Sequence, residues 1–172
     1  SLGTMVANLS AHKAGWDDQW EFFSNWAVKG QAYKEQLLFL VDEDTHAFNK
    51  IIDGFRMPKD TDDEKEARAL AIENATIYAT EIPFKVMETA FQSMEVMQAM
   101  LKDGLQNSLS DAGVGVLCAR TAVIGAYFNV RINAKDIKNR EFAEKILAKA
   151  ASIYKQTIAI ENDTIAYIDS KM

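Results

Sequence analysis

The sequence has few residues that interrupt helices or cross-link a chain. Its 172 residues include two prolines, eight glycines, one cysteine and two histidines. A single cysteine excludes a disulfide framework within the chain and is typical of a reducing compartment, so we expect a cytoplasmic protein. Cys118 lies in an apolar stretch and is expected to be a buried, inert thiol. The scarcity of Pro and Gly leaves long intervals in which helices can continue.

An excess of positive charge is also missing. Nineteen basic residues stand against 25 acidic ones, a net charge of −6, which argues against binding to nucleic acid or to an anionic membrane surface. No uninterrupted apolar run reaches the roughly 18 residues of a membrane span. Neither a phosphate-cradling nor a dinucleotide-binding glycine motif is present. We therefore expect no nucleic-acid, nucleotide or membrane partner.

The sequence has the composition of an ordinary globular protein, and helical periodicity extends along most of its length. Hydrophobic residues make up 48%, which suits one folded domain spanning residues 1–172. Apolar residues recur at steps of three and four, and this predicts an all-α fold, a helical bundle of long antiparallel helices. A short apolar helix is expected near the start. The long helices are expected over residues 31–55, 61–104, 110–133 and 139–172.

Local signals set several of these helix ends. Thr61 and Glu64 have the spacing of a capping box, in which each side chain satisfies an exposed amide of the other residue. Pro83 is expected to interrupt and kink the helix that follows, because its ring clashes with the preceding turn. Ser110 or Asp111 is expected to cap the next helix.

A carboxylate lies inside an apolar seam of the 31–55 helix. The seam consists of Leu37, Val41, Asp44, Phe48, Ile51 and Phe55. Desolvation disfavours a buried carboxylate and raises its pKa toward a range useful for proton transfer. The alternative is a polar residue that pairs with a basic partner and fixes the helix register. Sequence alone leaves both interpretations of Asp44 open.

Two asparagines continue a stripe of small residues on the 110–133 helix. The stripe runs from Gly115 to Ala126 and indicates close helix packing, and Asn129 and Asn133 follow in the same register. Buried amides require hydrogen bonds. These two therefore either hold a polar ligand or pair with a neighbouring helix.

One possible metal motif is incomplete. Glu43 and His46 form an E-x-x-H pattern, which di-iron bundles use twice. Only one copy occurs here, and His12 cannot complete a second. No metal site is expected.

Four ordered blocks of sequence resemble the family of formiminotetrahydrofolate cyclodeaminase and methenyltetrahydrofolate cyclohydrolase. Each block is weak alone, but together they span most of the chain. They are Met5–Leu9 with Lys13; Leu40–Asp44 with Ala47 and Phe48; Met57–Lys59; and Asn107–Asp111 with Gly125–Asn133.

The resemblance implies a folate enzyme that assembles as a homodimer or a higher homo-oligomer. It implies closure of 5-formiminotetrahydrofolate to 5,10-methenyltetrahydrofolate with release of ammonia, with a tetrahydrofolate derivative as substrate and no permanently bound cofactor. Asp44 is then the candidate proton-transfer group, and Asp111 the orienting or charge-stabilising group. Candidate substrate-binding residues, including contacts to a glutamate tail, are Arg56, Lys59, Ser110, Asn129, Arg131 and Asn133.

Two alternatives remain at this point. The same pocket suits hydrolysis of the methenyl bridge by a cyclohydrolase. A noncatalytic helical folate-binding or assembly module would use Asp44 and the asparagines only for packing. Family members usually carry a Pro- and Gly-rich segment before the Ser-Leu-Gly-Thr-Met block, and this sequence begins after that segment. We therefore expect part of the ligand cradle to be absent from these residues.

Overall fold

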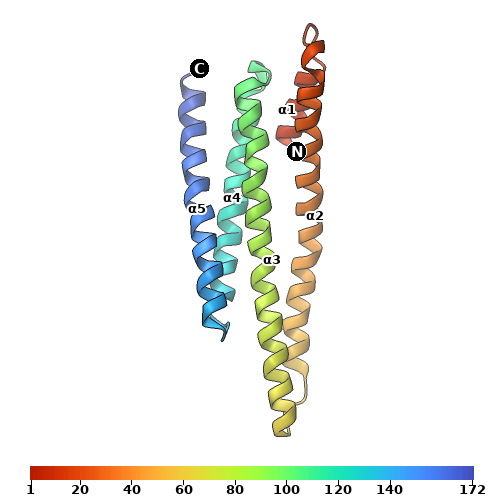
Figure 1. The fold of residues 1–172 in the computed structure, drawn as a ribbon, viewed down its shortest axis with the longest axis vertical. Coiled ribbons are helices and arrows are strands. Elements are labelled where there is room, and N and C mark those ends of the chain that lie inside the picture. Colours follow the sequence, from red (N-terminus) through yellow and green to blue (C-terminus); the bar gives the residue numbers. More distant parts are fainter.

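The computed structural model describes all 172 residues, and every regular element in it is helical. The all-α prediction is confirmed. Figure 1 shows the long helices side by side, with neighbours antiparallel and α3 between α2 and α4, while the short α1 lies beside the first part of α2. The elements are α1 (Leu2–Ala11), α2 (Trp20–Arg56), α3 (Asp62–Asp103), α4 (Leu109–Asn133) and α5 (Arg140–Asp169), with single 3-10 turns at Asp17–Gln19 and Gln106–Ser108.

Helix α2 begins earlier than the periodicity predicted. It continues through Gly30 without a break. The reason for a glycine here is space, because a Cβ atom at Gly30 would lie 2.5 Å from Thr4 Oγ1 of α1. The Thr4 side chain of α1 therefore packs directly against the backbone of α2 at this level.

Helix α3 continues through Pro83, so the predicted interruption is wrong. Proline has no N–H, and the carbonyl of Ala79 therefore lacks its usual partner four residues along the helix. Asn133 of α4 supplies a replacement, because its Nδ2 donates to Ala79 O at 2.6 Å. The proline is tolerated because a neighbouring helix satisfies the carbonyl that it leaves free.

The predicted start of α3 is confirmed and that of α4 is corrected. Glu64 N donates to Thr61 Oγ1, and Thr61 N donates to Glu64 Oε2, which completes the capping box. Helix α4 begins at Leu109, after a 3-10 turn, with no side-chain cap. Ser110 and Asp111 therefore lie in its first turn. There the carboxylate of Asp111 interacts favourably with the positive end of the helix dipole, but it does not cap the helix.

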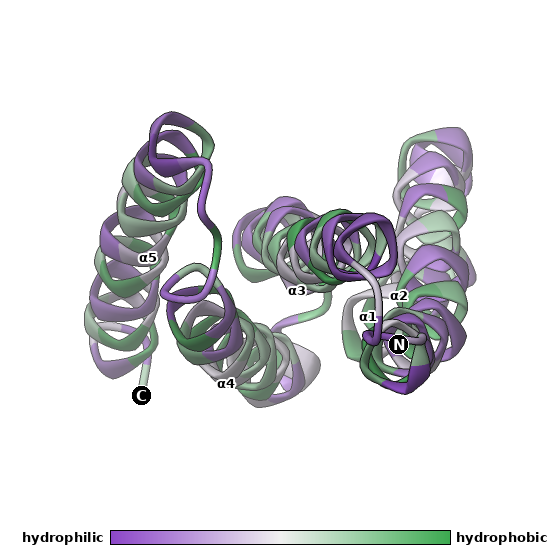
Figure 2. Cartoon of the chain, turned by 90° about the horizontal axis from the view of Figure 1, so that it is seen from below, coloured by the Kyte–Doolittle hydropathy of each residue, from purple (hydrophilic) through white to green (hydrophobic).

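The apolar core divides along the length of the bundle. One cluster, which includes Val6, Phe23 and Met94, joins α1 to the first part of α2 and the adjoining ends of α3 and α4. A second cluster joins α3, α4 and α5, and a third joins the far parts of α2 and α3. Figure 2 shows that α2 and α4 lie on opposite sides of α3 and that the helices mix polar and apolar faces.

One helix is apolar enough by composition to cross a membrane, a property that the sequence analysis did not anticipate. This helix spans residues 106–133, and only 39% of its most apolar 18-residue window is buried within the chain. Arg120 on this helix pairs with Glu161 of α5, with 3.0 Å between Nε and Oε2. Helix α4 is therefore packed between α3 and α5 and keeps a largely apolar outer face.

Candidate functional site

An open groove lies where the first residue of α1 meets α2, α3 and α4. Its volume is about 380 Å³. Gly30 and Gly115 are part of its wall, and small side chains at Ala90 and Ala119 keep it open. Helix α1 packs between α2 and α4 and fills the space there. The open part of the groove therefore lies beyond the first residues of α1, on the side away from the rest of that helix. The remaining lining residues are Ser1, Gly3, Thr4, Tyr33, Lys34, Leu37, Leu38, Val41, Ser93, Val96, Met97, Cys118 and Ala122.

Few polar groups reach this apolar groove. Lys34 is its one lysine. Thr4 Oγ1 is buried without a hydrogen-bond partner in the chain, and Ser93 Oγ donates to Ala90 O. The groove therefore suits a largely apolar or aromatic ligand with an anionic group near Lys34.

Tyr33 anchors one wall of the groove to α3. Its hydroxyl donates to Glu95 Oε1, and Lys29 Nζ lies 2.8 Å from the other oxygen of Glu95. Burial and the hydrogen bond to Glu95 raise the pKa of Tyr33 to about 12. Burial acts to raise the pKa of Glu95, but the bonds from Lys29 and Tyr33 outweigh it and the net pKa is lowered. Glu95 is thus an ionised anchor for the wall.

Asp44 continues the groove wall of α2, but it is exposed. The lining residues Lys34, Leu37 and Val41 recur at steps of three and four, and Asp44 follows one turn later. The seam prediction is therefore corrected. Phe48, also in the seam, is 61% exposed, because the buried face of α2 runs through Leu40 and Ala47 instead. Within a single chain, Asp44 is not desolvated.

The asparagines continue the opposite wall on α4. Asn129 is exposed, about two turns beyond the groove residue Ala122 and about three turns beyond Cys118. Asn133 is half-buried and bonds to the Ala79 carbonyl. Of the two interpretations of these amides, the structure supports pairing with a neighbouring helix for Asn133.

Asp44 and Asp111 do not meet within one chain. The hydroxyl of Tyr78 donates to Glu43, so Asp44 is level with that part of α3. Gly115 contacts Met97, so Asp111, one turn earlier, is level with the end of α3. At 1.5 Å per residue the two carboxylates are about 30 Å apart along the bundle. Ser110, next to Asp111, is exposed and equally remote.

The three predicted arginine and lysine contacts are also dispersed. Arg56 ends α2 and pairs loosely with Asp53 at 3.9 Å, and Lys59 is exposed in the turn before α3. Figure 1 shows this turn extending beyond the ends of α4 and α5. Twelve residues of helix place Arg56 about 18 Å from Asp44. Arg131 lies over the ring of Tyr127, with 5.5 Å from its Cζ to the ring centroid. No single pocket joins these residues.

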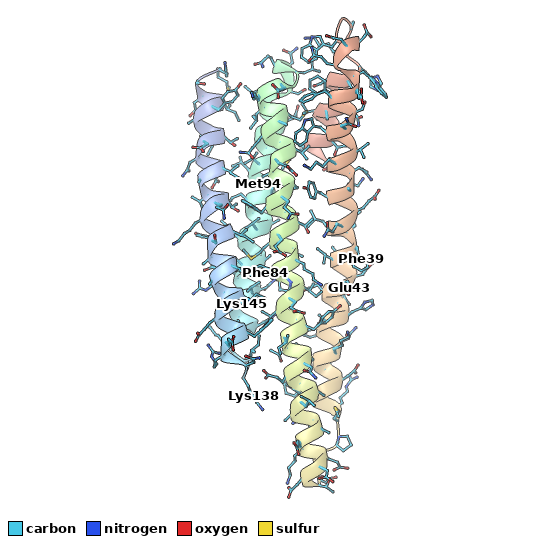
Figure 3. The ribbon with its side chains drawn as sticks, viewed as in Figure 1. Phe39, Glu43, Phe84, Met94, Lys138 and Lys145 are labelled. Carbon is cyan, nitrogen blue, oxygen red and sulfur yellow. The ribbon has the colours of Figure 1, made fainter.

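A second polar cluster lies between α2 and α3. The sequence pattern identified two of its members but did not predict that they form a cluster with residues of α3. Glu43 accepts from Tyr78 and lies 3.1 Å from His46 Nδ1, and the hydrogen bonds from these two residues lower its pKa. Lys50 Nζ lies 4.0 Å from the centroid of the Tyr78 ring. Figure 3 labels Glu43 on α2. The E-x-x-H pair thus forms a local contact, and no group of three His, Cys, Asp or Glu side chains converges as a metal site.

Three groove residues differ from expectation. Cys118 is exposed and lines the groove, so the predicted buried thiol is wrong. Tyr33 and Lys34 were not predicted as groove residues, although continuing the seam of Asp44 and Val41 toward the start of α2 reaches both of them. The seam therefore lies on the helix face that lines the groove, and only its burial within the chain was misjudged.

Comparison with known proteins decides which family has this fold and these blocks. A family model described as formiminotransferase-cyclodeaminase matches residues 1–152. The chain belongs to the formiminotransferase-cyclodeaminase family. The resemblance inferred from the sequence blocks is thereby confirmed, and with it membership of a family of folate one-carbon enzymes.

Two kinds of family member align with the chain. A methenyltetrahydrofolate cyclohydrolase of Methylorubrum extorquens is 28% identical over 100% of this chain and 83% of its own length. The formimidoyltransferase-cyclodeaminase of Mus musculus is 31% identical over 91% of this chain, but the match spans only 29% of that longer protein. The crystal structure of formiminotetrahydrofolate cyclodeaminase from Thermotoga maritima shares the fold, with a TM-score of 0.78 at 19% identity over 99% of this chain and 79% of that one.

Proposed function

We propose that this chain closes 5-formiminotetrahydrofolate to 5,10-methenyltetrahydrofolate and releases ammonia. The observation that carries the proposal is the family match over residues 1–152. In this reaction N10 of the folate attacks the formimino carbon and loses its proton, while the departing nitrogen gains protons and leaves as ammonia. The product carries a delocalised positive charge. A carboxylate suits both the proton transfers and the charge.

The groove and its continuation on α2 supply the residues for this chemistry. Its apolar wall suits the pterin and aminobenzoate rings, and Lys34 suits a carboxylate of the glutamate tail, whatever the tail length. Asp44, one turn beyond Val41, is the proposed proton-transfer group, and Asn129 on the facing wall is a proposed ring contact. Asp111 is proposed as the charge-stabilising group. Arg56, Lys59, Ser110, Arg131 and Asn133 remain predictions as substrate contacts.

Hydrolysis of the methenyl bridge is the second candidate. The relative that aligns over the whole of this chain and 83% of its own length is a methenyltetrahydrofolate cyclohydrolase. The two reactions share the methenyl compound, as product of the first and substrate of the second. Purified protein incubated with each folate and followed by methenyl absorbance separates them. Absorbance appears with the formimino substrate under the first proposal and disappears with the methenyl substrate under the second. No change with either folate would overturn both.

Asp44→Asn tests the proposed proton transfer. We expect a loss of turnover of about 100-fold or more, the scale of positioned acid–base catalysis. The side chain is exposed, and we expect the melting temperature of the variant to stay close to that of wild type. Asp42→Asn, an exposed neighbour outside the groove face, is the matched control and should retain activity. Full activity in Asp44→Asn contradicts a catalytic role.

A further inference from the structure

The half of α2 that carries Asp44 is held by few buried side chains. After Gly30, the buried residues of this helix are Leu40, Ala47 and Gly54. Because α1 lies beside only the first part of α2, and α4 lies on the other side of α3 (Figure 2), this half of α2 packs against α3. Interlocking side chains fix the angle at which one helix faces another, and alanine and glycine offer little to interlock. Apolar packing therefore specifies the rotation of α2 about its own axis only weakly here.

One hydrogen bond fixes that rotation at the level of Asp44. The hydroxyl of Tyr78 on α3 donates to Oε2 of Glu43. This bond raises the pKa of Tyr78 and is the largest cause of the lowered pKa of Glu43, so at neutral pH a protonated donor meets an ionised acceptor. Hydrogen bonds to a charged partner are about twice as strong as neutral ones. Because Glu43 directly precedes Asp44, the bond acts one residue away from the proposed proton-transfer group.

Both partners of this bond are restrained from a second side. Oε1 of Glu43 lies 3.1 Å from Nδ1 of His46. The ring of Tyr78 packs against Lys50, with 4.0 Å from Nζ to the ring centroid. A carboxylate and a ring that are already restrained lose less side-chain freedom when they bond to each other. The contact between Tyr78 and Glu43 therefore has a defined geometry.

The same level of α3 also holds the opposite wall of the groove. Ala79, the residue after Tyr78, accepts from Nδ2 of Asn133 on α4 at 2.6 Å. Adjacent residues of α3 thus hold α2 on one side and α4 on the other. Asn133 lies about one turn beyond Asn129, the proposed ring contact. Asp44 and Asn129 are therefore each placed by a neighbouring residue that is anchored to α3.

We propose that Tyr78 is a positioning residue, which acts through Glu43 to aim the carboxylate of Asp44 at the reacting nitrogen of the substrate. This role rests on the proposed function, in which Asp44 transfers the proton. Side-chain ends lie about 5 Å from a helix axis, so a rotation of α2 by about 20° moves the carboxylate by about 2 Å. A misplacement of about 1 Å can lower a rate by about 100-fold. Loss of the Tyr78 bond should therefore appear in turnover.

Tyr78→Phe tests the role, because it removes the hydroxyl and keeps the ring against Lys50. We expect kcat to fall by about 10- to 100-fold and KM to stay within about twofold of wild type, since the groove itself is unchanged. Glu43→Gln keeps an oxygen that can accept from Tyr78 and should retain most of kcat. Glu43→Ala removes the acceptor and should match Tyr78→Phe. The methenyl absorbance assay gives both constants.

Thr61→Ala is the matched control for stability. It weakens the start of α3 by removing the acceptor for the Glu64 amide and should keep the kcat of wild type. Full kcat in Tyr78→Phe would overturn the role, and so would an equal fall in kcat in Thr61→Ala, because a general loss of stability would then explain both. Glu43→Gln as slow as Glu43→Ala would also overturn it, since the charge of Glu43 would then be needed for the chemistry itself.

Spin labels test the geometry without any assay of activity. One label attaches to Cys118 of α4, the only cysteine, and the other to a cysteine introduced by Asp42→Cys on the exposed face of α2. The labelled chain is refolded with excess unlabelled chain, so that double electron–electron resonance measures the distance within one chain. We expect a narrow distance distribution without a further change and a broader or shifted one with Tyr78→Phe.

The two measurements separate the two proposals. An unchanged distance distribution in Tyr78→Phe overturns the positioning role, whatever the activity. A wild type that acts on neither folate overturns the proposed function and the role of Asp44 in it. A changed distribution in that case would still show that the Tyr78 contact orients α2.

Discussion

At the scale of single residues, Pro83 and Asn133 act as a pair. The proline removes the N–H that would bond the Ala79 carbonyl, and the asparagine amide replaces it from the neighbouring helix. Sequence periodicity placed both residues correctly but treated the proline as a break and the asparagine as a possible ligand contact. A buried carbonyl without a partner costs about 1–3 kcal/mol. This cost is sufficient reason for an amide at position 133.

A double-mutant cycle measures the pairing. Asn133→Ala should lower the free energy of unfolding by about 1–2 kcal/mol, because the Ala79 carbonyl loses its donor. In a Pro83→Ala background the backbone N–H returns, and the same replacement should cost much less. Urea denaturation of the four proteins gives the coupling. Equal costs in the two backgrounds would show that Asn133 contributes in some other way.

At the scale of helices, two tyrosine–glutamate contacts join α2 to α3 in opposite directions. Tyr33 of α2 donates to Glu95 of α3, and Tyr78 of α3 donates to Glu43 of α2. Between these contacts the two helices pack through small and aliphatic residues, as at Leu40, Ala79 and Ile82. These polar contacts fix how α2 and α3 align along their length. The apolar contacts alone specify this register only weakly.

These contacts predict how stability depends on pH. The pKa values of Glu43 and Glu95 are lowered, so their contribution is present above the ordinary glutamate pKa and is lost as pH falls below it. The pKa of Tyr33 is raised from 10.0 to about 12, so its contribution is present below pH 10 and is lost as pH rises toward 12. Melting temperatures across both ranges test this. Tyr33→Phe should show a shallower alkaline loss than wild type, whereas Tyr154→Phe should match wild type.

The capping box gives a second prediction for the helices. Thr61→Ala removes the acceptor for the Glu64 amide and should destabilise α3 by about 1 kcal/mol. Ser152→Ala, on the exposed face of α5, removes a hydroxyl without removing a cap and should be neutral or slightly stabilising. Thermal unfolding of both variants makes the comparison. A neutral Thr61→Ala would mean that water satisfies the helix end equally well.

At the scale of the whole molecule, exposed apolar surface is the dominant feature. Figure 3 shows Phe39 on α2, and this residue is 62% exposed like several others along the same helix. Some of these residues border the groove, and some, such as Val28, face away from it. Those on the groove side of α2 and those on α4, such as Val41 and Phe128, are covered by no helix of the same chain.

The sequence by itself determined the helical class, the capping box at Thr61, and the family, because these depend on local periodicity, local hydrogen bonds and ordered blocks of residues. It also placed Asp44 and Asn129 on the helix faces that continue the groove walls. Only the tertiary structure decided burial: Asp44 and Cys118 proved exposed, and Asp44 and Asp111 proved distant within one chain. The physical reason is that periodicity shows which residues share a face of a helix. What covers that face depends on how the helices pack, and for the outer face of α4 no helix of the same chain covers it.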